Sequence, residues 1–229
     1  MEATTNKGDF CMEIVNTVSA KNQVARGEEL NHLGNENAPV KILVVGNSIT
    51  LHAPKPEIGW HYSWGMAASA EEKDYVHVLF SKLKAAGKDV FMRVHQMAYW
   101  ERNFLTENIE ALYAEDHAFD PDILVFRLGE NVPDASIPHF KAAMERLIHY
   151  ICPNGKVVYT TTFFKNHPLD AAIRETAKAR GENVAEIGWE TRDWMAIGLF
   201  EHDGVQIHPG DLGMQVIADR IYEQMIPLL

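Results

Sequence analysis

The chain has 229 residues, of which 46% are hydrophobic and 23% are charged, and its formal net charge is −11. This composition is typical of a globular chain long enough to bury a core, and it excludes a disordered one. The acidic charge argues against a nucleic-acid partner, whose phosphates need a basic face. No stretch approaches the roughly 20 apolar residues that span a bilayer, so we expect no membrane partner either.

The N-terminus, the cysteines and the histidines indicate the compartment and the metal content. The first residues, MEATTNKGDF, lack the basic start and apolar core of a signal peptide, which favours a cytoplasmic location. Cys11 and Cys152 lie far apart without a CxxC spacing, so we expect free thiols. The 11 histidines form neither an HxH nor an HExxH pair, so we expect no bound metal.

Residues 1–38 are polar and mixed, with one strand-like piece at 11–18. We interpret this segment as an appended arm or an extra edge strand, and residues 39–229 as one domain. Such an arm is suited to a homodimer contact, although the sequence leaves the oligomeric state open.

From residue 40 onward, strand and helix patterns alternate. Residues 42–45 form a continuous apolar run, which is typical of a strand covered on both faces. Further strands are expected at 90–94, 123–128, 156–162 and 183–187, and helices at 70–86, 137–151, 169–180 and 212–225. Five strands alternating with helices predict a parallel, doubly wound sheet in a three-layer α/β/α sandwich. Ligands of such sheets bind beyond the carboxyl ends of the strands, so the loops that follow the strands are the expected site.

The loop after the first strand reads Gly46-Asn47-Ser48. Ser48 stands where a helix is expected, and a serine N-cap or an anion-binding helix start are two interpretations. Neither the Walker spacing nor GxGxxG is present, which disfavours a nucleotide site. The third interpretation is a nucleophile whose own N–H helps to hold an oxyanion. The elbow GxSxG would need a glycine where Thr50 stands, which disfavours an ordinary α/β-hydrolase.

The loop after the third strand contains Gly129-Glu130-Asn131. A glycine permits close backbone approach, and Asn131 can direct an amide N–H across the sheet edge toward developing negative charge. A turn glycine followed by an Asx-type asparagine is the alternative.

The segment before the last helix contains His208 followed by proline, with acidic neighbours. A histidine fixed at a helix entrance is suited to lie beside a nucleophile from the other end of the chain, whereas a lone one would be structural. Asp203 is the most plausible acid to orient it.

These three motifs, taken in order, resemble the SGNH/GDSL hydrolase family over roughly residues 40–226. The resemblance implies a flavodoxin-like three-layer fold with no metal or organic cofactor. It implies Ser48 as the nucleophile, Asn131 as an oxyanion-hole donor and His208 as the general base. Asn47 stands where the family has an aspartate.

The chain departs from the family pattern at two places. The family aspartate lies three residues before the histidine, where this chain has Val205. Asp203 lies five residues before His208, so it must reach the imidazole across a bulge. Otherwise, Glu201 or a backbone carbonyl orients the ring. The family also has a glycine after the second strand whose N–H binds the oxyanion, and this chain has no glycine there. We expect an N–H of residues 98–100 to take this role, and we assign it to Tyr99.

An aromatic insert at 51–65 and the loop after the second strand suggest the substrate. Trp60, Trp64 and Trp100 are expected to stack on sugar rings, although Trp60 and Trp64 could equally pack the insert against the sheet. Asn47 and Glu130 complete the expected substrate contacts, with a structural ion pair between Arg127 and Glu130 as the alternative.

No lid or long apolar channel is visible in the sequence, which favours a short-acyl esterase over a long-chain lipase. The preferred function is removal of acetyl from a carbohydrate or a small ester. A thioesterase or lysophospholipase is the alternative within the same class, and a non-catalytic sugar-binding module is the alternative outside it.

Overall fold

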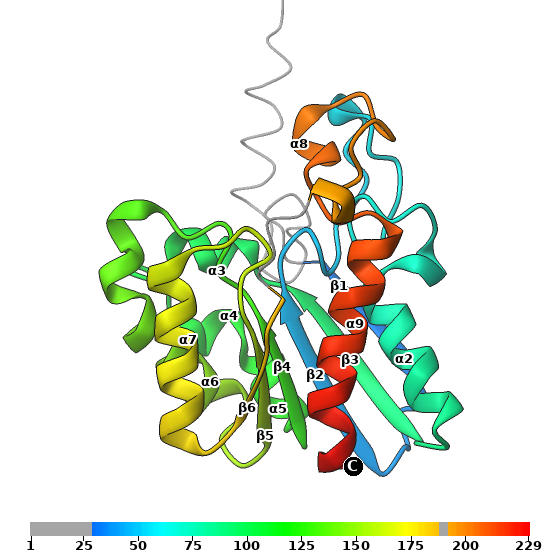
Figure 1. Cartoon of the computed structure of the whole chain (residues 1–229). Helices are drawn as coiled ribbons and strands as arrows, with labels where there is room; N and C mark the ends of the chain where they lie inside the picture. The colour runs from blue at the N-terminus through cyan, green and yellow to red at the C-terminus, as the bar shows by residue number, and fades with distance from the viewer. Residues whose placement is uncertain (1–28, 188–191) are drawn as a thin grey trace, which may run out of the picture.

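The structure is a computed structural model that describes residues 29–187 and 192–229 (Figure 1). The strand-like piece expected at 11–18 lies outside the described residues. Among those described, no helix has both the length and the apolar character needed to cross a bilayer.

A six-stranded sheet forms the middle layer, in the order β1-β3-β2-β4-β5-β6. The strands are β1 (Leu30–Gly34), β2 (Val40–Gly46), β3 (Val90–Gln96), β4 (Ile123–Arg127), β5 (Lys156–Thr160) and β6 (Asn183–Ala185). Strands β2 to β6 are parallel and lie in the flavodoxin-like order. The predicted parallel sheet is thereby confirmed, but it carries one more strand.

The additional strand, β1, pairs antiparallel with the outer edge of β3. It lies in the segment for which the sequence left an arm or an edge strand open. The division of the chain at residue 38 stays a prediction.

Helices cover both faces of the sheet because the central strand is apolar on both faces (Figure 1). Ile42 and Val44 pack on one side with α2 (Tyr75–Ala85) and α9 (Asp211–Met225). Leu43 and Val45 pack on the other side with α6 (Phe140–Ile151) and α7 (His167–Arg180). The remaining helices are α3 (Ala98–Asn103), α4 (Ile109–Leu112), α5 (Ala114–Phe119) and α8 (Asp203–Gln206), with short 3-10 turns at Pro56–Ile58, Glu71–Lys73, Asp134–His139, Arg192–Trp194 and Ile226–Leu228.

Two helices begin later than the sequence pattern indicates. Asp74 accepts a hydrogen bond from the His77 N–H and caps α2, so α2 starts at Tyr75 rather than at residue 70. Pro138 lies in a 3-10 turn, and α6 therefore starts at Phe140 rather than at residue 137.

A third hydrophobic cluster lies outside the sheet and joins two distant segments. Trp60 and Met66 of the insert pack there against Ala196 and Val205 of the segment that leads to His208. In Figure 1 the cyan insert and the orange segment with α8 lie together beyond one end of the sheet. This arrangement brings the histidine segment over the loops that follow the strands.

Candidate active site

Ser48 and His208 lie in direct contact, although 160 residues separate them in the chain. The distance from Ser48 Oγ to His208 Nε2 is 2.8 Å, which is a hydrogen bond. Ser48 lies two residues after the end of β2, in a turn rather than at the start of a helix, so the N-cap interpretation is wrong. Gly46 is required before this turn, because a Cβ there would lie 1.8 Å from Thr50 Oγ1.

A backbone carbonyl orients the His208 ring. Its Nδ1 lies 2.7 Å from the carbonyl oxygen of Gly204, which can only accept a hydrogen bond. The proton therefore resides on Nδ1, and Nε2 is left to accept the Ser48 hydroxyl proton. Of the three orienting groups considered from the sequence, the structure shows the backbone carbonyl.

The prediction that Asp203 orients His208 is wrong. Asp203 is exposed at the start of α8, where its carboxylate accepts a hydrogen bond from the Gln206 side chain at 3.4 Å. The two extra residues between the acid and the histidine are taken up by this helical turn. The turn places the Gly204 carbonyl, rather than a carboxylate, four residues before His208 and next to it.

The surroundings of His208 keep its imidazole neutral. Burial is the main cause that lowers its pKa to about 4, the neighbouring His52 and Arg127 add to the decrease, and the bond to Gly204 opposes it. At neutral pH the ring is therefore in the form that can take a proton from Ser48.

Asn131 presents its side chain to the same cavity as Ser48 and His208. Its Nδ2 donates to Glu101 Oε2 at 2.6 Å, and its Oδ1 accepts from Arg102 at 3.2 Å. Gly129 makes this turn possible: its φ is +153°, and a Cβ there would lie 2.6 Å from Thr162 Cγ2. The expected donor is thus placed near the expected nucleophile.

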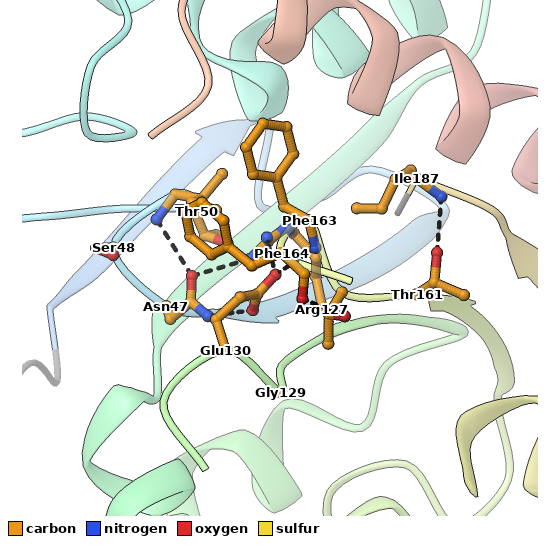
Figure 2. Close-up of polar contacts among 12 residues, drawn as sticks. Asn47, Ser48, Thr50, Arg127, Gly129, Glu130, Thr161, Phe163, Phe164 and Ile187 are labelled. Atoms are coloured by element: carbon orange, nitrogen blue, oxygen red, sulfur yellow. Dashed lines mark hydrogen bonds and ion pairs between the residues drawn. The ribbon is translucent and has the colours of Figure 1, made fainter. Parts of the chain in front are cut away.

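Asn47 and Glu130 belong to a buried polar network beneath Ser48 (Figure 2). Arg127 is fully buried and donates to Asn47 Oδ1 at 2.9 Å and to Glu130 Oε1 at 2.6 Å. Asn47 Nδ2 donates to Glu130 Oε2 at 2.6 Å, and the Phe163 N–H donates to Glu130 Oε1 at 2.8 Å. The expected substrate contacts of Asn47 and Glu130 are wrong, because their polar atoms are occupied within the protein; the structural ion pair is confirmed.

Glu101 is a buried acid of the site that the sequence reasoning missed. It is completely buried at the site's edge, and it accepts hydrogen bonds from the Asn47 side chain, the Gly129 N–H and Asn131. Burial is the main cause that raises its pKa to about 7, and the Glu130 carboxylate adds to the increase. One feature of the sequence could have indicated this residue: Glu101 is the single charged residue of Met97-Ala-Tyr-Trp-Glu101, which follows a strand predicted to be buried.

The three tryptophans expected to bind sugar do not line the cavity. Trp60 is fully buried in the third cluster against Phe200, and Trp100 is buried against aromatic residues of the core. Trp64 is half-buried and stacks on Tyr62 with ring centroids 4.3 Å apart. The substrate role is wrong for Trp60 and Trp100, which are buried, and stays a prediction for Trp64. Trp64 packs the insert against the sheet cluster, whereas Trp60 packs it against the histidine segment.

The loop after β3 supplies its N–H groups mostly to the protein itself. The Met97 N–H donates to the Gly46 carbonyl at 2.6 Å, and the Ala98 N–H donates to Gln96 Oε1 at 2.7 Å. Tyr99 lies in the first turn of α3 and does not line the described cavity, so its oxyanion role stays a prediction.

The cavity beside Ser48 has a volume of about 630 Å³. Its lining is mixed: polar side chains, among them Ser48, His52, Lys55, Gln96, Arg102, Asn131, His202 and His208, alternate with apolar ones such as Pro54, Ile58 and Met66. Within the described ranges, no group of three or more His, Cys, Asp or Glu side chains is arranged to hold a metal ion. The cavity therefore places the Ser48 hydroxyl and the His208 imidazole beside amide, ammonium and guanidinium groups.

Comparisons with known proteins identify the fold. No family model matches the chain, and no curated protein matches it. Solved structures do match. A family 3 carbohydrate esterase from Clostridium thermocellum matches with a TM-score of 0.56 and 16% identity, over 82% of this chain and 96% of that one. A lipase/acylhydrolase from Enterococcus faecalis matches with a TM-score of 0.53 and 16% identity, over 81% of this chain and 95% of that one. A family two carbohydrate esterase from Cellvibrio japonicus matches at 0.51 with 17% identity, over 83% of this chain and 62% of that one.

The protein therefore has the α/β fold of the SGNH/GDSL hydrolases. At these identities the comparisons define the fold, and the activity has to be argued from the site.

Proposed function

We propose that the protein is a serine esterase that removes short acyl groups, acetyl above all, from carbohydrate or other small esters through an acyl-enzyme on Ser48. One observation carries this proposal: Ser48 Oγ lies 2.8 Å from His208 Nε2, while the Gly204 carbonyl fixes the tautomer of the ring. A nucleophile next to an oriented base is the arrangement that acyl transfer requires. The fold shared with two carbohydrate esterases and a lipase/acylhydrolase supports it.

The reaction proceeds in two halves. His208 Nε2 takes the Ser48 proton as Oγ attacks the ester carbonyl, and the Ser48 N–H and the Asn131 side chain hold the oxyanion. His208 then gives its proton to the leaving alcohol. Water, deprotonated by the same imidazole, attacks the acyl carbon; the imidazolium then returns its proton to Ser48 Oγ as the bond from Oγ to the acyl carbon breaks and the carboxylic acid leaves. The Gly204 carbonyl accepts the Nδ1–H throughout, so the imidazolium forms without a carboxylate partner.

The character of the cavity favours a small acyl group on a polar alcohol. Apolar residues such as Ile58 and Met66 line part of its walls, but His52, Lys55, Arg102 and His202 interrupt them, so the apolar surface is not continuous. Such groups can donate and accept hydrogen bonds to sugar hydroxyls, whereas a long acyl chain would leave them unpaired. This observation ranks a carbohydrate esterase above a lysophospholipase.

The test is acetate release from p-nitrophenyl acetate and from acetylated xylan. Ser48→Ala and His208→Ala should each lower kcat by about 10³-fold or more, because either group is needed for the covalent step. Ser63→Ala and His61→Ala, at exposed positions of the insert, are matched controls and should keep the wild-type rate. Equal rates in all five proteins would refute the esterase, and activity on acyl-CoA but not on sugar esters would favour the thioesterase.

A further inference from the structure

We infer that Glu101 is a positioning residue of the oxyanion hole: its buried carboxylate holds the Asn131 amide so that one side-chain N–H faces the ester. This inference rests on the proposed esterase function. Three observations carry it: the polarity of the contacts to Asn131, the free donor that they leave, and the segments that Glu101 joins.

The contacts to Asn131 show which atom of its side-chain amide is the nitrogen and which is the oxygen. Glu101 Oε2 accepts from Nδ2 at 2.6 Å, and Arg102 donates to Oδ1 at 3.2 Å. A guanidinium can only donate, so the amide atom facing Arg102 is the oxygen and the atom facing Glu101 is the nitrogen. Two neighbouring residues of α3 thus hold the amide at both ends, and a rotation that exchanged its nitrogen and oxygen would break both bonds.

This arrangement leaves one donor for a ligand. The Asn131 amide nitrogen carries two hydrogens, and one of them points to Glu101. In the described part of the chain, no hydrogen bond uses the other one, and Asn131 lines the cavity together with Ser48 and His208. An N–H held beside the nucleophile is the group that stabilises a developing oxyanion.

Glu101 also joins the loops that carry the nucleophile and the donor. Its Oε1 accepts from Asn47 Nδ2 at 3.1 Å, next to Ser48, and from the backbone N–H of Gly129. One carboxylate on α3 therefore ties the loop after β2 to the loop after β4. Through these bonds, Glu101 holds Asn131 and the residue next to Ser48 in one hydrogen-bonded unit.

The position of Glu101 is unfavourable for a residue with only a packing role. The side chain is completely buried, and no described lysine or arginine forms an ion pair with it. Glu130 lies close enough to disfavour its charge, and the Arg127 guanidinium binds Glu130 and Asn47 instead. A buried charge without a counterion is costly unless hydrogen bonds compensate it, and here amide N–H groups of the oxyanion loop and of Asn47 compensate it.

A double-mutant cycle tests whether Glu101 acts through Asn131. Asn131→Ala should lower kcat about 10²-fold, as removal of an oxyanion donor does, and Glu101→Gln should lower kcat about tenfold with KM unchanged within about twofold. In the Asn131→Ala background, Glu101→Gln should change kcat by less than about twofold, because its target is already gone. Glu110→Gln, at an exposed position of α4, is the control and should match the wild type.

Two kinetic outcomes would overturn the inference. One is a Glu101→Gln loss of the same size in both backgrounds, which would mean that the two residues act independently. The other is an unchanged kcat in Glu101→Gln. If this variant fails to fold by circular dichroism, Glu101→Asp replaces it, since the shorter acid keeps the charge but withdraws from Asn131 and should show the same pattern.

A spectroscopic measurement separates this inference from the proposed activity. In ¹⁵N-labelled protein, the Asn131 side-chain amide signal, assigned by its loss in Asn131→Ala, should move upfield in Glu101→Gln as the bond to a carboxylate is lost. An unmoved signal would overturn the role of Glu101 even in an active esterase. A moved signal with no ester cleaved by the wild type would refute the proposed function while keeping the contact.

Discussion

The two halves of the site are held in place by different forces. The half with Ser48 and Asn131 stands on the ends of parallel strands and is anchored by fully buried charges, Arg127 and Glu101 among them. The half with His208 lies on a segment beyond the sheet, anchored by a backbone carbonyl and by the apolar cluster around Trp60.

This difference follows from what each half has to do. The oxyanion side must present fixed dipoles at one point, and charged hydrogen bonds provide direction at a cost in desolvation. The histidine side needs only one ring nitrogen toward Ser48. A carbonyl acceptor fixes that orientation, and apolar packing holds the segment without buried charge.

Arg127→Met removes a buried charge that anchors the half of the site with Ser48 and Asn131, and it should have the largest effect on stability. The change leaves Glu130 and Asn47 without their partner, and removing one member of a buried ion pair costs about 3–5 kcal/mol. The free energy of unfolding in urea measures this loss. Arg146→Met, at an exposed position, is the control and should stay within about 0.5 kcal/mol. A loss at Arg127 below about 1 kcal/mol would show that the network is not a major anchor.

Trp60→Ala breaks the second half. The ring is completely buried between the insert and the histidine segment, so its removal should cost about 3 kcal/mol of unfolding free energy. Because Val205 and the Gly204 carbonyl belong to that segment, kcat should fall as well. Trp60→Phe keeps most of the apolar contact and should lose less of both. Full kcat in a folded Trp60→Ala variant would contradict the positioning of His208 by this cluster.

The parts of the site that lie at strand ends could be predicted from the sequence. Ser48 and Asn131 lie in recognisable motifs just after β2 and β4, and these paired parallel strands bring the two loops to one edge of the sheet. That geometry places both at the cavity that His208 also lines. The same argument placed the five parallel strands, because runs such as residues 42–45 are apolar on both faces.

The parts that depend on side-chain burial and local turns could not be predicted. Sequence shows that tryptophans stand near the site but not whether their rings face the cavity or the core, and Trp60 and Trp100 face the core. Glu101 gains its role only from donors on two other loops that strand pairing brings to it. Asp203 was misassigned because two extra residues fold into a helical turn rather than a bulge.

The pH dependence of kcat/KM should separate the two halves. Glu101, with its pKa raised to about 7, becomes protonated below neutrality and can no longer accept all its hydrogen bonds, so activity should fall as pH decreases through about 7. The Glu130 carboxylate raises this pKa, while Arg127 and Arg102 bind the Asn47 and Asn131 side chains that Glu101 also binds. His208, with its pKa lowered to about 4, should lose its role as base only near that pH.

Glu101→Gln removes the first of these titrations and leaves the second. Its kcat/KM profile should be flat from about pH 8 to 5 and fall near pH 4, whereas the wild type already declines near pH 7. Identical profiles for the two proteins would show that Glu101 does not control the decline near neutrality. Stopped assays with p-nitrophenyl acetate, corrected for its spontaneous hydrolysis, cover the whole range.

Asp203→Asn should have the smallest effect and is the sharpest test of how the histidine half is built. The Nδ1 proton of His208 goes to the Gly204 carbonyl, so removing the Asp203 charge should change kcat by less than about twofold. In an enzyme whose aspartate orients the histidine, the same substitution costs about 10⁴-fold. A loss of that order would mean that the carboxylate replaces the carbonyl during turnover. A loss of kcat below about twofold would show that His208 acts as a general base with the Gly204 carbonyl, rather than a carboxylate, as its hydrogen-bond acceptor.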